Sequence, residues 1–177
     1  MEIRHSQERD LERIMEIYSG ARRFMAEHGN PRQWGATNWP PEELIRKDIR
    51  TGKSYVCIAN GHVAGTFFYD YGDEIEPAYG AIKDGAWKMG GPYGVVHRVA
   101  SDGSVRGIGS FCLNWAFEQC AHLRIDTHGD NKVMQKLLKG LGFEQRGIVF
   151  VEEDNEPRLA FERAAEELQS DAGIKEV

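Results

Sequence analysis

The dipeptide Asn60-Gly61 is the feature of this sequence that most restricts its fold. It separates two strand-like runs, residues 54–59 and 62–69, and the second run is rich in aromatic and β-branched side chains. An Asn-Gly pair between such runs is typical of a two-residue β-hairpin, because both residues readily adopt the left-handed conformations that the tight turn needs. The sequence therefore predicts an antiparallel pair of strands.

Elsewhere in the sequence, strands are followed by helices. Strand-like runs at residues 94–100 and 123–127 precede helices that begin at Gly107 and Lys132. Two strands of one sheet that are joined by a crossover helix pair in parallel. Together with the hairpin, this order predicts an α/β fold of the α+β type, in which a mixed sheet is flanked by helices.

The remaining segments complete the order of elements. Apolar residues recur at helical spacing in residues 11–25, and a second helix is expected between Pro41 and Gly52. The other expected strands cover residues 3–5, 143–151 and 158–161. The full order is β-α-α-β-β-β-α-β-α-β-β.

Length and composition restrict the class of protein. The 177 residues suit one domain with one core. We assign residues 1–162 to that domain and residues 163–177 to a charged C-terminal tail. The chain has neither a run of eighteen apolar residues nor an apolar N-terminal stretch, which argues against a membrane span and a signal peptide. Its three cysteines form no Cys-x-x-Cys pair, so we expect a reducing, cytoplasmic location rather than a disulfide framework.

The charge indicates which partners to expect. A net charge of −6 argues against a nucleic-acid partner, because phosphate backbones favour basic faces. It suits a cationic or neutral substrate better than an anionic one. No His-x-x-x-His or comparable ligand spacing is present in the sequence, so we expect no metal.

Residues 70–92 form an unusually long connection between two expected strands. The segment is rich in glycine, proline and charged residues, and it contains Tyr79 and Trp87. Long ordered loops are often functional, and the alternative is a partly mobile insertion. The sequence does not decide between the two.

Residues 99–110 combine the end of a strand, a turn of small residues and a helix that begins on Gly107 and Gly109. The first amide groups of a helix have no partners within it, and the helix dipole favours an anion there. Glycines let a phosphate approach the backbone, and Arg106 adds a positive charge. The segment is not a P-loop, because no Lys-Ser or Lys-Thr follows, and Cys112 stands where a Rossmann fingerprint needs its third glycine.

Residues 104–109, Ser-Val-Arg-Gly-Ile-Gly, resemble motif A of the GNAT superfamily of N-acetyltransferases, Arg/Gln-x-x-Gly-x-Gly/Ala, with Ser104 at the first position. Residues 131–143 run from Asn131 to Leu-Gly-Phe and resemble motif B of the same superfamily. The order of elements also agrees over residues 1–161. The resemblance implies a mostly antiparallel mixed sheet that is splayed between its fourth and fifth strands.

The resemblance also implies a cofactor, acetyl-CoA, bound in the cleft between the strands that end at Ala100 and Thr127. The backbone of Val99 and Ala100 would pair with the pantetheine arm, and main-chain groups would polarise the thioester carbonyl. The expected cofactor-binding residues are Arg98, Val99, Ala100, Ser104, Val105, Arg106, Gly107, Ile108, Gly109, Ser110, Asn131 and Met134.

Proton transfer is the least determined part of the expected chemistry. The family often has a tyrosine acid seven residues after the motif B asparagine, and Leu138 occupies that position here. Three residues are candidates for acid–base work instead: His97, His128 and Tyr93. His97 shares a strand face with Val99, and the alternative interpretation is a core or sheet-surface histidine satisfied by a neighbour.

The other candidates have alternatives too. His128 lies near Asp126 and Asp130, and the alternative interpretation is that it belongs to a polar turn before a helix. The alternative for Tyr93 is an aromatic residue at the edge of the sheet. Asp126 is expected to face the substrate. Trp87 and Tyr93 are expected to border the acceptor site.

The predicted function is transfer of an acetyl group from acetyl-CoA to a primary amine of a small molecule or peptide by direct attack. The alternative is a non-catalytic CoA-binding or sensing module, because Leu138 replaces the usual acid. A homodimer formed through the final strands is a further expectation.

Overall fold

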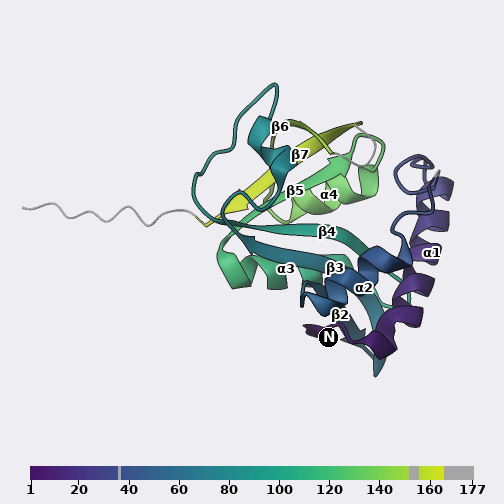
Figure 1. Ribbon diagram of the computed structural model, residues 1–177. Helices are drawn as coiled ribbons and strands as arrows, with labels where there is room; N and C mark the ends of the chain where they lie inside the picture. The colour runs from purple at the N-terminus through teal and green to yellow at the C-terminus, as the bar shows by residue number, and fades with distance from the viewer. Residues whose placement is uncertain (36, 152–155, 166–177) are drawn as a thin grey trace, which may run out of the picture.

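In the computed structural model, which describes residues 1–35, 37–151 and 156–165, seven strands form one sheet in the order β1-β2-β3-β4-β5-β7-β6 (Figure 1). All neighbouring strands pair antiparallel except β4 and β5, which pair in parallel. The predicted mixed, mostly antiparallel sheet is confirmed. The strands are β1 (Glu2–His5), β2 (Ser54–Ala59), β3 (His62–Gly72), β4 (Tyr93–Ser101), β5 (His122–His128), β6 (Glu144–Phe150) and β7 (Pro157–Ala164).

The predicted hairpin joins β2 to β3. Asn60 and Gly61 have φ angles of 51° and 78°, and Ala59 pairs with His62 across the turn. Both angles lie in the left-handed region, which explains why an Asn-Gly pair stands here. The local sequence therefore sets this part of the sheet.

The sheet divides where β4 meets β5. The two strands are in register only at Gly94 with Leu123 and at Val95 with Arg124. Beyond these positions β4 follows β3 and β5 follows β7, so the two halves diverge. The predicted splay between the fourth and fifth strands is confirmed, and it leaves one edge of β4 without a β5 partner over the rest of its described length.

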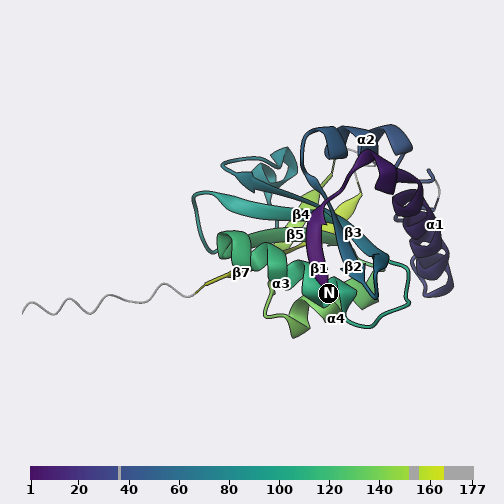
Figure 2. The same ribbon diagram turned by 90° about the horizontal axis from the view of Figure 1, so that it is seen from below.

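Helices cover both faces of the sheet. Helices α3 (Ile108–Cys120) and α4 (Lys132–Gly140) pack on one face, below the sheet in the view of Figure 2. Helices α1 (Leu11–Glu27) and α2 (Glu42–Arg50) pack on the opposite face of the β1–β4 half. Apolar side chains at helical spacing in α1, among them Ile14 and Tyr18, are fully buried there.

Residues 73–92, here called the covering segment, lie over the β4–β7 half on the same face as α1 and α2. In Figure 1 this teal segment stands beside β6 and β7. It contains the short 3₁₀ helix η2 (Pro77–Ala81), and Tyr79 is buried against Tyr93 and Val95. The first three residues of the predicted loop, 70–72, belong instead to β3, because that strand pairs with β4 up to Gly72.

The covering segment also reaches the outer edge of β6. Lys83 and Ile148 exchange two backbone hydrogen bonds of 2.8 Å. A Cβ atom on Gly85 would lie 1.8 Å from the carbonyl oxygen of Arg146, so this close approach requires glycine. Pairing between subunits through the final strands stays a prediction. At Ile148 the backbone groups of the β6 edge are already bonded to Lys83.

The C-terminal boundary of the folded domain lies slightly beyond the expected one. Strand β7 continues to Ala164, past the expected domain limit at residue 162, and pairs with β5 to its end. Residues 152–155, and the part of the expected tail from residue 166 onward, lie outside the described residues. In the part of the chain that is described, no helix combines the length and apolarity needed to cross a bilayer.

Candidate active site

A cleft of about 960 Å³ opens where β4 and β5 diverge. It runs from the loop between β4 and α3, along β4, to the ends of β5 and α1. Its walls include the β4 residues 96–101, Gly109 at the start of α3, and the β5 residues 125–127. The divergence of the strands makes this space, so the topology of the sheet positions the site.

One end of the cleft is the N-terminus of α3. Gly107 precedes the helix with a φ angle of 85°, and no side chain caps the helix there. The Gly107 carbonyl accepts the bond from the Phe111 amide, so the amides just before Phe111 lack partners within the helix. A Cβ atom on Gly103 or Gly107 would have no neighbour within 4 Å, which leaves open space beside these amides. Such a helix start attracts anions.

The loop before α3 is held by Asp102. Its Oδ1 accepts hydrogen bonds from the Ser104 amide at 2.9 Å and the Ser104 hydroxyl at 2.6 Å. Its Oδ2 pairs with Arg13 of α1 at 2.6 Å. Burial raises the pKa of Asp102, but these hydrogen bonds and Arg13 together outweigh that effect, and the net shift is downward. The loop is therefore tied to α1 before any ligand binds.

A bulge in β4 lies beside the cleft. The register with β3 shifts between Thr66 and Phe68, and Arg98 opposite has a φ angle of 55°. The Arg98 carbonyl accepts a 3.1 Å hydrogen bond from the Tyr18 hydroxyl, and its guanidinium lies 2.6 Å from Asp48. Burial raises the pKa of Tyr18 to about 12, so the phenol remains a donor. These contacts hold an unusual backbone conformation in place.

His97 lies at the fork of the sheet, which is the place just beyond Val95 and Arg124 where β4 and β5 diverge. Its imidazole lies between two carboxylates. Its Nε2 lies 2.9 Å from Glu76 Oε2, and its Nδ1 lies 3.8 Å from Asp126 Oδ1. The Tyr79 hydroxyl donates to Asp126 at 2.8 Å. Burial raises the pKa of Glu76, but the contact with His97 lowers it more, and the net shift is downward. Both His97 and Asp126 line the cleft.

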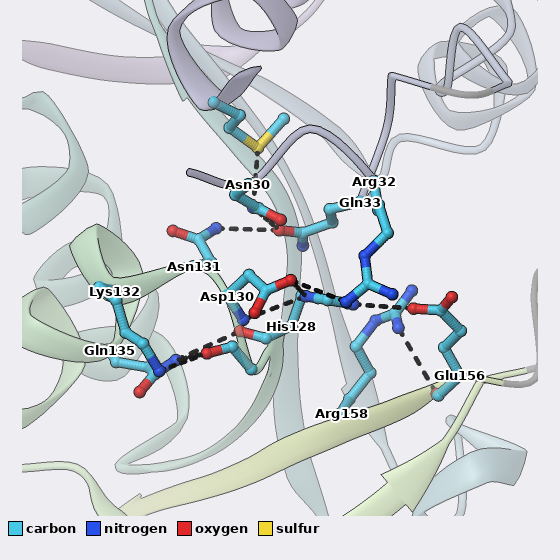
Figure 3. Close-up of polar contacts among 12 residues, drawn as sticks. Asn30, Arg32, Gln33, His128, Asp130, Asn131, Lys132, Gln135, Glu156 and Arg158 are labelled. Carbon is cyan, nitrogen blue, oxygen red and sulfur yellow. Dashed lines mark hydrogen bonds and ion pairs between the residues drawn. The ribbon is translucent and has the colours of Figure 1, made fainter. Parts of the chain in front are cut away.

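The segment after α1 contributes Gln33 to the lining of the cleft, and Figure 3 shows Gln33 beside Asn131. Asn131 caps α4 by accepting a 3.0 Å hydrogen bond from the Met134 amide, and its amide group donates to Gln33 at 3.0 Å. Arg32 pairs with Asp130 at 2.9 Å in the same region. The turn between β5 and α4 is thus linked to the chain that follows α1.

A solved structure described as a GNAT-family acetyltransferase from Streptococcus agalactiae is 30% identical to this chain, with a TM-score of 0.84 over 93% of this chain and 95% of the other. This chain belongs to the GNAT family of acetyltransferases.

More distant structures share the fold alone. A GNAT-family acetyltransferase from Listeria monocytogenes is 16% identical, with a TM-score of 0.66 over 93% of this chain and 94% of that one. A ribosomal-protein-alanine N-acetyltransferase from Brucella melitensis is 19% identical, with a TM-score of 0.60 over 93% of this chain and 100% of that one. Comparison with protein-family models and with curated proteins gave no match.

Some of the residues expected to bind the cofactor in this GNAT protein line the cleft, and the others lie in the loop before α3 and in its first turn. Ile108 is buried with its side chain in the core, so only its backbone is available to a ligand. The Ser104 hydroxyl is bonded to Asp102. Arg106 is exposed beside the helix start. The expected residues that line the cleft are Arg98, Val99, Ala100, Gly109, Asn131 and Met134.

The expected catalytic and substrate residues fall into two groups. His97 and Asp126 come together at the fork. Tyr93 is 3% exposed and packs beneath the covering segment. His128 is buried, with Nε2 2.8 Å from Glu156 and Nδ1 accepting from the Asp130 amide at 3.1 Å. These contacts match the interpretation of His128 as part of a polar turn.

Trp87 and Leu138 also lie away from the fork. The Trp87 indole donates to the Tyr79 carbonyl at 2.8 Å, and its ring lies 4.5 Å from the Arg124 guanidinium. Trp87 thus joins the covering segment to β5. Leu138 is fully buried among the core residues shared by α3, α4 and the sheet.

Two further residues, Glu76 and Gln33, were not predicted from the sequence. They contact two of the predicted residues, His97 and Asn131. Both lie in irregular segments without periodicity. Glu76 is 21 positions from its partner and Gln33 is 98 positions away. The only available signal was the unusual length of residues 70–92, which indicated that the segment does more than connect two strands.

Proposed function

We propose that this GNAT-family protein transfers an acetyl group from acetyl-CoA to a primary amine of a small molecule or peptide. The observation that carries the proposal is the continuity of the cleft. It reaches from Gly103 and Gly109, on either side of the uncapped start of α3, to the His97–Asp126 pair at the fork. An anion site and a proton acceptor in one cavity are what amine acylation by a CoA thioester needs.

The residues present fit the diphosphate and the pantetheine arm. Helix amides near Gly109, with open space beside Gly103 and Gly107, suit a diphosphate. The β4 edge after Val95 has no β5 partner in the described chain, so Val99 and Ala100 are free to pair with an extended arm. Acetyl-CoA supplies an activated acyl carbon when it is bound.

Residues of the fork supply the rest of the chemistry. The carboxylate of Asp126 favours the approach of a positively charged amine. His97 takes the proton that the amine loses as it attacks. A thiolate is a weak base, with a reference pKa of about 8.5, so its departure does not require a strong acid at the position of Leu138.

The second candidate is a CoA-binding module without turnover. The observation that favours it is Leu138, which is buried and apolar where relatives often carry an acid. The two candidates agree on cofactor binding and differ only in chemistry. Thiol release from acetyl-CoA in the presence of a panel of primary amines separates them: release that depends on an amine supports transfer, and binding without release supports the module.

Cofactor binding itself is tested at Ser110, in the first turn of α3. A carboxylate at this place is favourable to the helix, but it competes with a bound diphosphate. We expect Ser110→Glu to weaken acetyl-CoA binding by about tenfold or more while the protein keeps its thermal stability, in line with a like-charge cost of roughly 1–2 kcal/mol. Titration calorimetry measures the affinity.

The matched control for this experiment is Ser110→Gln, which has the same size without the charge. We expect it to bind acetyl-CoA within about threefold of the natural protein, because a neutral side chain adds no like-charge repulsion. Equal affinity of the Glu and Gln variants would place the diphosphate elsewhere and contradict the proposal.

A further inference from the structure

The covering segment holds one carboxylate, that of Glu76, in a fixed place over β4. Farther along the segment, the Lys88 and Met89 amides donate to Glu162 of β7 at 2.6 and 3.4 Å. Tyr79 follows Glu76 by three residues and is bonded to Asp126 of β5. The Glu76 amide donates to the Tyr93 hydroxyl at 3.4 Å. The position of Glu76 is therefore set by contacts with three strands of the sheet.

The contact with Glu76 determines which nitrogen of His97 carries hydrogen. The pKa of Glu76 is lowered, so its carboxylate is ionised at neutral pH and only accepts hydrogen bonds. At 2.9 Å from this carboxylate, Nε2 must be the protonated nitrogen of the neutral ring. Nδ1 then carries the lone pair, and it faces Asp126 at the fork.

We propose that Glu76 is the positioning residue of the transfer reaction, fixing the His97 tautomer whose Nδ1 accepts the proton of the amine. This inference rests on the proposed function. A positively charged amine first gives up one proton to solvent. As the nitrogen of the neutral amine then bonds to the acyl carbon, its second proton passes to Nδ1, and the carbon–sulfur bond breaks with its electron pair leaving on sulfur. The imidazolium that results lies between two carboxylates, which stabilise its charge.

The charged and titratable groups around His97 support this arrangement. Arg98 and Asp48 form an ion pair with each other, so their charges largely cancel. Burial raises the pKa of Tyr79 well above its usual value, and its phenol stays neutral. The net field at the imidazole is that of two carboxylates. The groups that face His97 are Glu76, Asp126, Tyr79, Arg98 and Asp48.

The test compares Glu76→Gln and Glu76→Ala with the natural protein. Gln can still accept from Nε2 but has no charge, and Ala releases the ring altogether. We expect kcat to fall about 100-fold in Glu76→Ala, at the lower limit of acid–base effects, and by less, about tenfold, in Glu76→Gln, which keeps the hydrogen bond. The acid limb of the kcat/KM profile moves to lower pH in both, because a neighbouring negative charge no longer favours the protonated ring. The KM for acetyl-CoA stays unchanged.

The matched control is Glu74→Gln, the same substitution at an exposed position of the covering segment. It keeps both kcat and the pH profile, whereas a general loosening of the segment would affect this variant as well. If the acid limb of the kcat/KM profile is unchanged in Glu76→Gln, the inference about Glu76 is overturned. The proposed function still stands in that case, provided that the natural protein transfers the acetyl group. If circular dichroism shows that Glu76→Ala is unfolded, Glu76→Gln decides alone. Absence of amine-dependent thiol release in the natural protein overturns both.

Discussion

Two histidine–glutamate pairs connect the covering segment with the sheet, and their surroundings differ. His97 lies 2.9 Å from Glu76, with side chains that are 20% and 26% exposed. His122 lies 2.8 Å from Glu162, with side chains that are 7% and 1% exposed. The pair chemistry is the same in both, but only His97 lines the cleft.

The number of partners distinguishes the two glutamates further. Glu162 also lies 3.5 Å from the Arg124 Nε and 3.2 Å from the Arg146 Nε, and it accepts hydrogen bonds from two amides of the covering segment. A carboxylate with so many donors is a fixed structural centre. The pair at the fork has fewer partners: His97 Nε2 contacts Glu76, and Nδ1 lies 3.8 Å from Asp126 in the lining of the cleft. The comparison teaches that access and spare bonding capacity, not the pair itself, indicate a chemical role.

The largest expected effect is on stability at the buried pair. Glu162→Gln leaves Arg124, Arg146 and His122 without their shared anion, and breaking a buried ion pair costs about 3–5 kcal/mol. Urea unfolding measures the free energy of unfolding. Glu76→Gln serves as the control and loses about 1 kcal/mol or less, because its pair is partly exposed. Equal losses at the two glutamates would remove the distinction drawn above.

The next effect is on activity at the fork. His97→Asn removes the proposed proton acceptor, and we expect kcat/KM to fall about 100-fold, as is typical for loss of a general base. His122→Asn is the matched variant: it lowers the melting temperature, and the protein that stays folded keeps its kcat. Steady-state kinetics with acetyl-CoA and an accepted amine measures both. A larger loss of kcat in His122→Asn than in His97→Asn would reverse the assignment.

The smallest expected effect is in the pH dependence of stability. Burial raises the pKa of Glu162, but hydrogen bonds from His122 and the Lys88 and Met89 amides lower it more, so the net shift is downward. Its contribution is fully present above the ordinary value of 4.5 and is lost as the pH falls through the lower folded value.

The difference in unfolding free energy between the natural protein and Glu162→Gln should therefore shrink as the pH falls from 5 to 3, by about 1 kcal/mol or more. Urea midpoints measured at intervals of half a pH unit follow this change. A difference that stays constant down to pH 3 would show that ionisation of Glu162 does not stabilise the fold.

Much of the local structure was predictable from short stretches of sequence. The hairpin at Asn60-Gly61 and the helix start at Gly107 both require left-handed backbone angles, and glycine or asparagine at these positions indicates such angles. Strand β2 was predicted with its observed ends at Ser54 and Ala59. These features depend on residues a few positions apart, so their signals are local.

The candidate site was predictable only in part. The cofactor end followed from the glycine-led helix start and the resemblance to motifs A and B, and His97 was one of three candidates for proton transfer. Tyr93 and His128 looked equally suitable in the sequence, yet the fold buries both of them. Burial depends on which segments pack over a strand, and the sequence of the strand itself does not predict those segments.

What the sequence alone determined was therefore the order of elements, the hairpin, the start of α3 and the resemblance to the GNAT family. Only the tertiary structure decided that Glu76 lies beside His97 while Glu162 lies beside His122, 40 positions away. The physical reason is one of range. Backbone preferences act over a few residues, whereas the partner of a side chain depends on how distant segments pack, and the covering segment has no periodicity that would fix its place in advance.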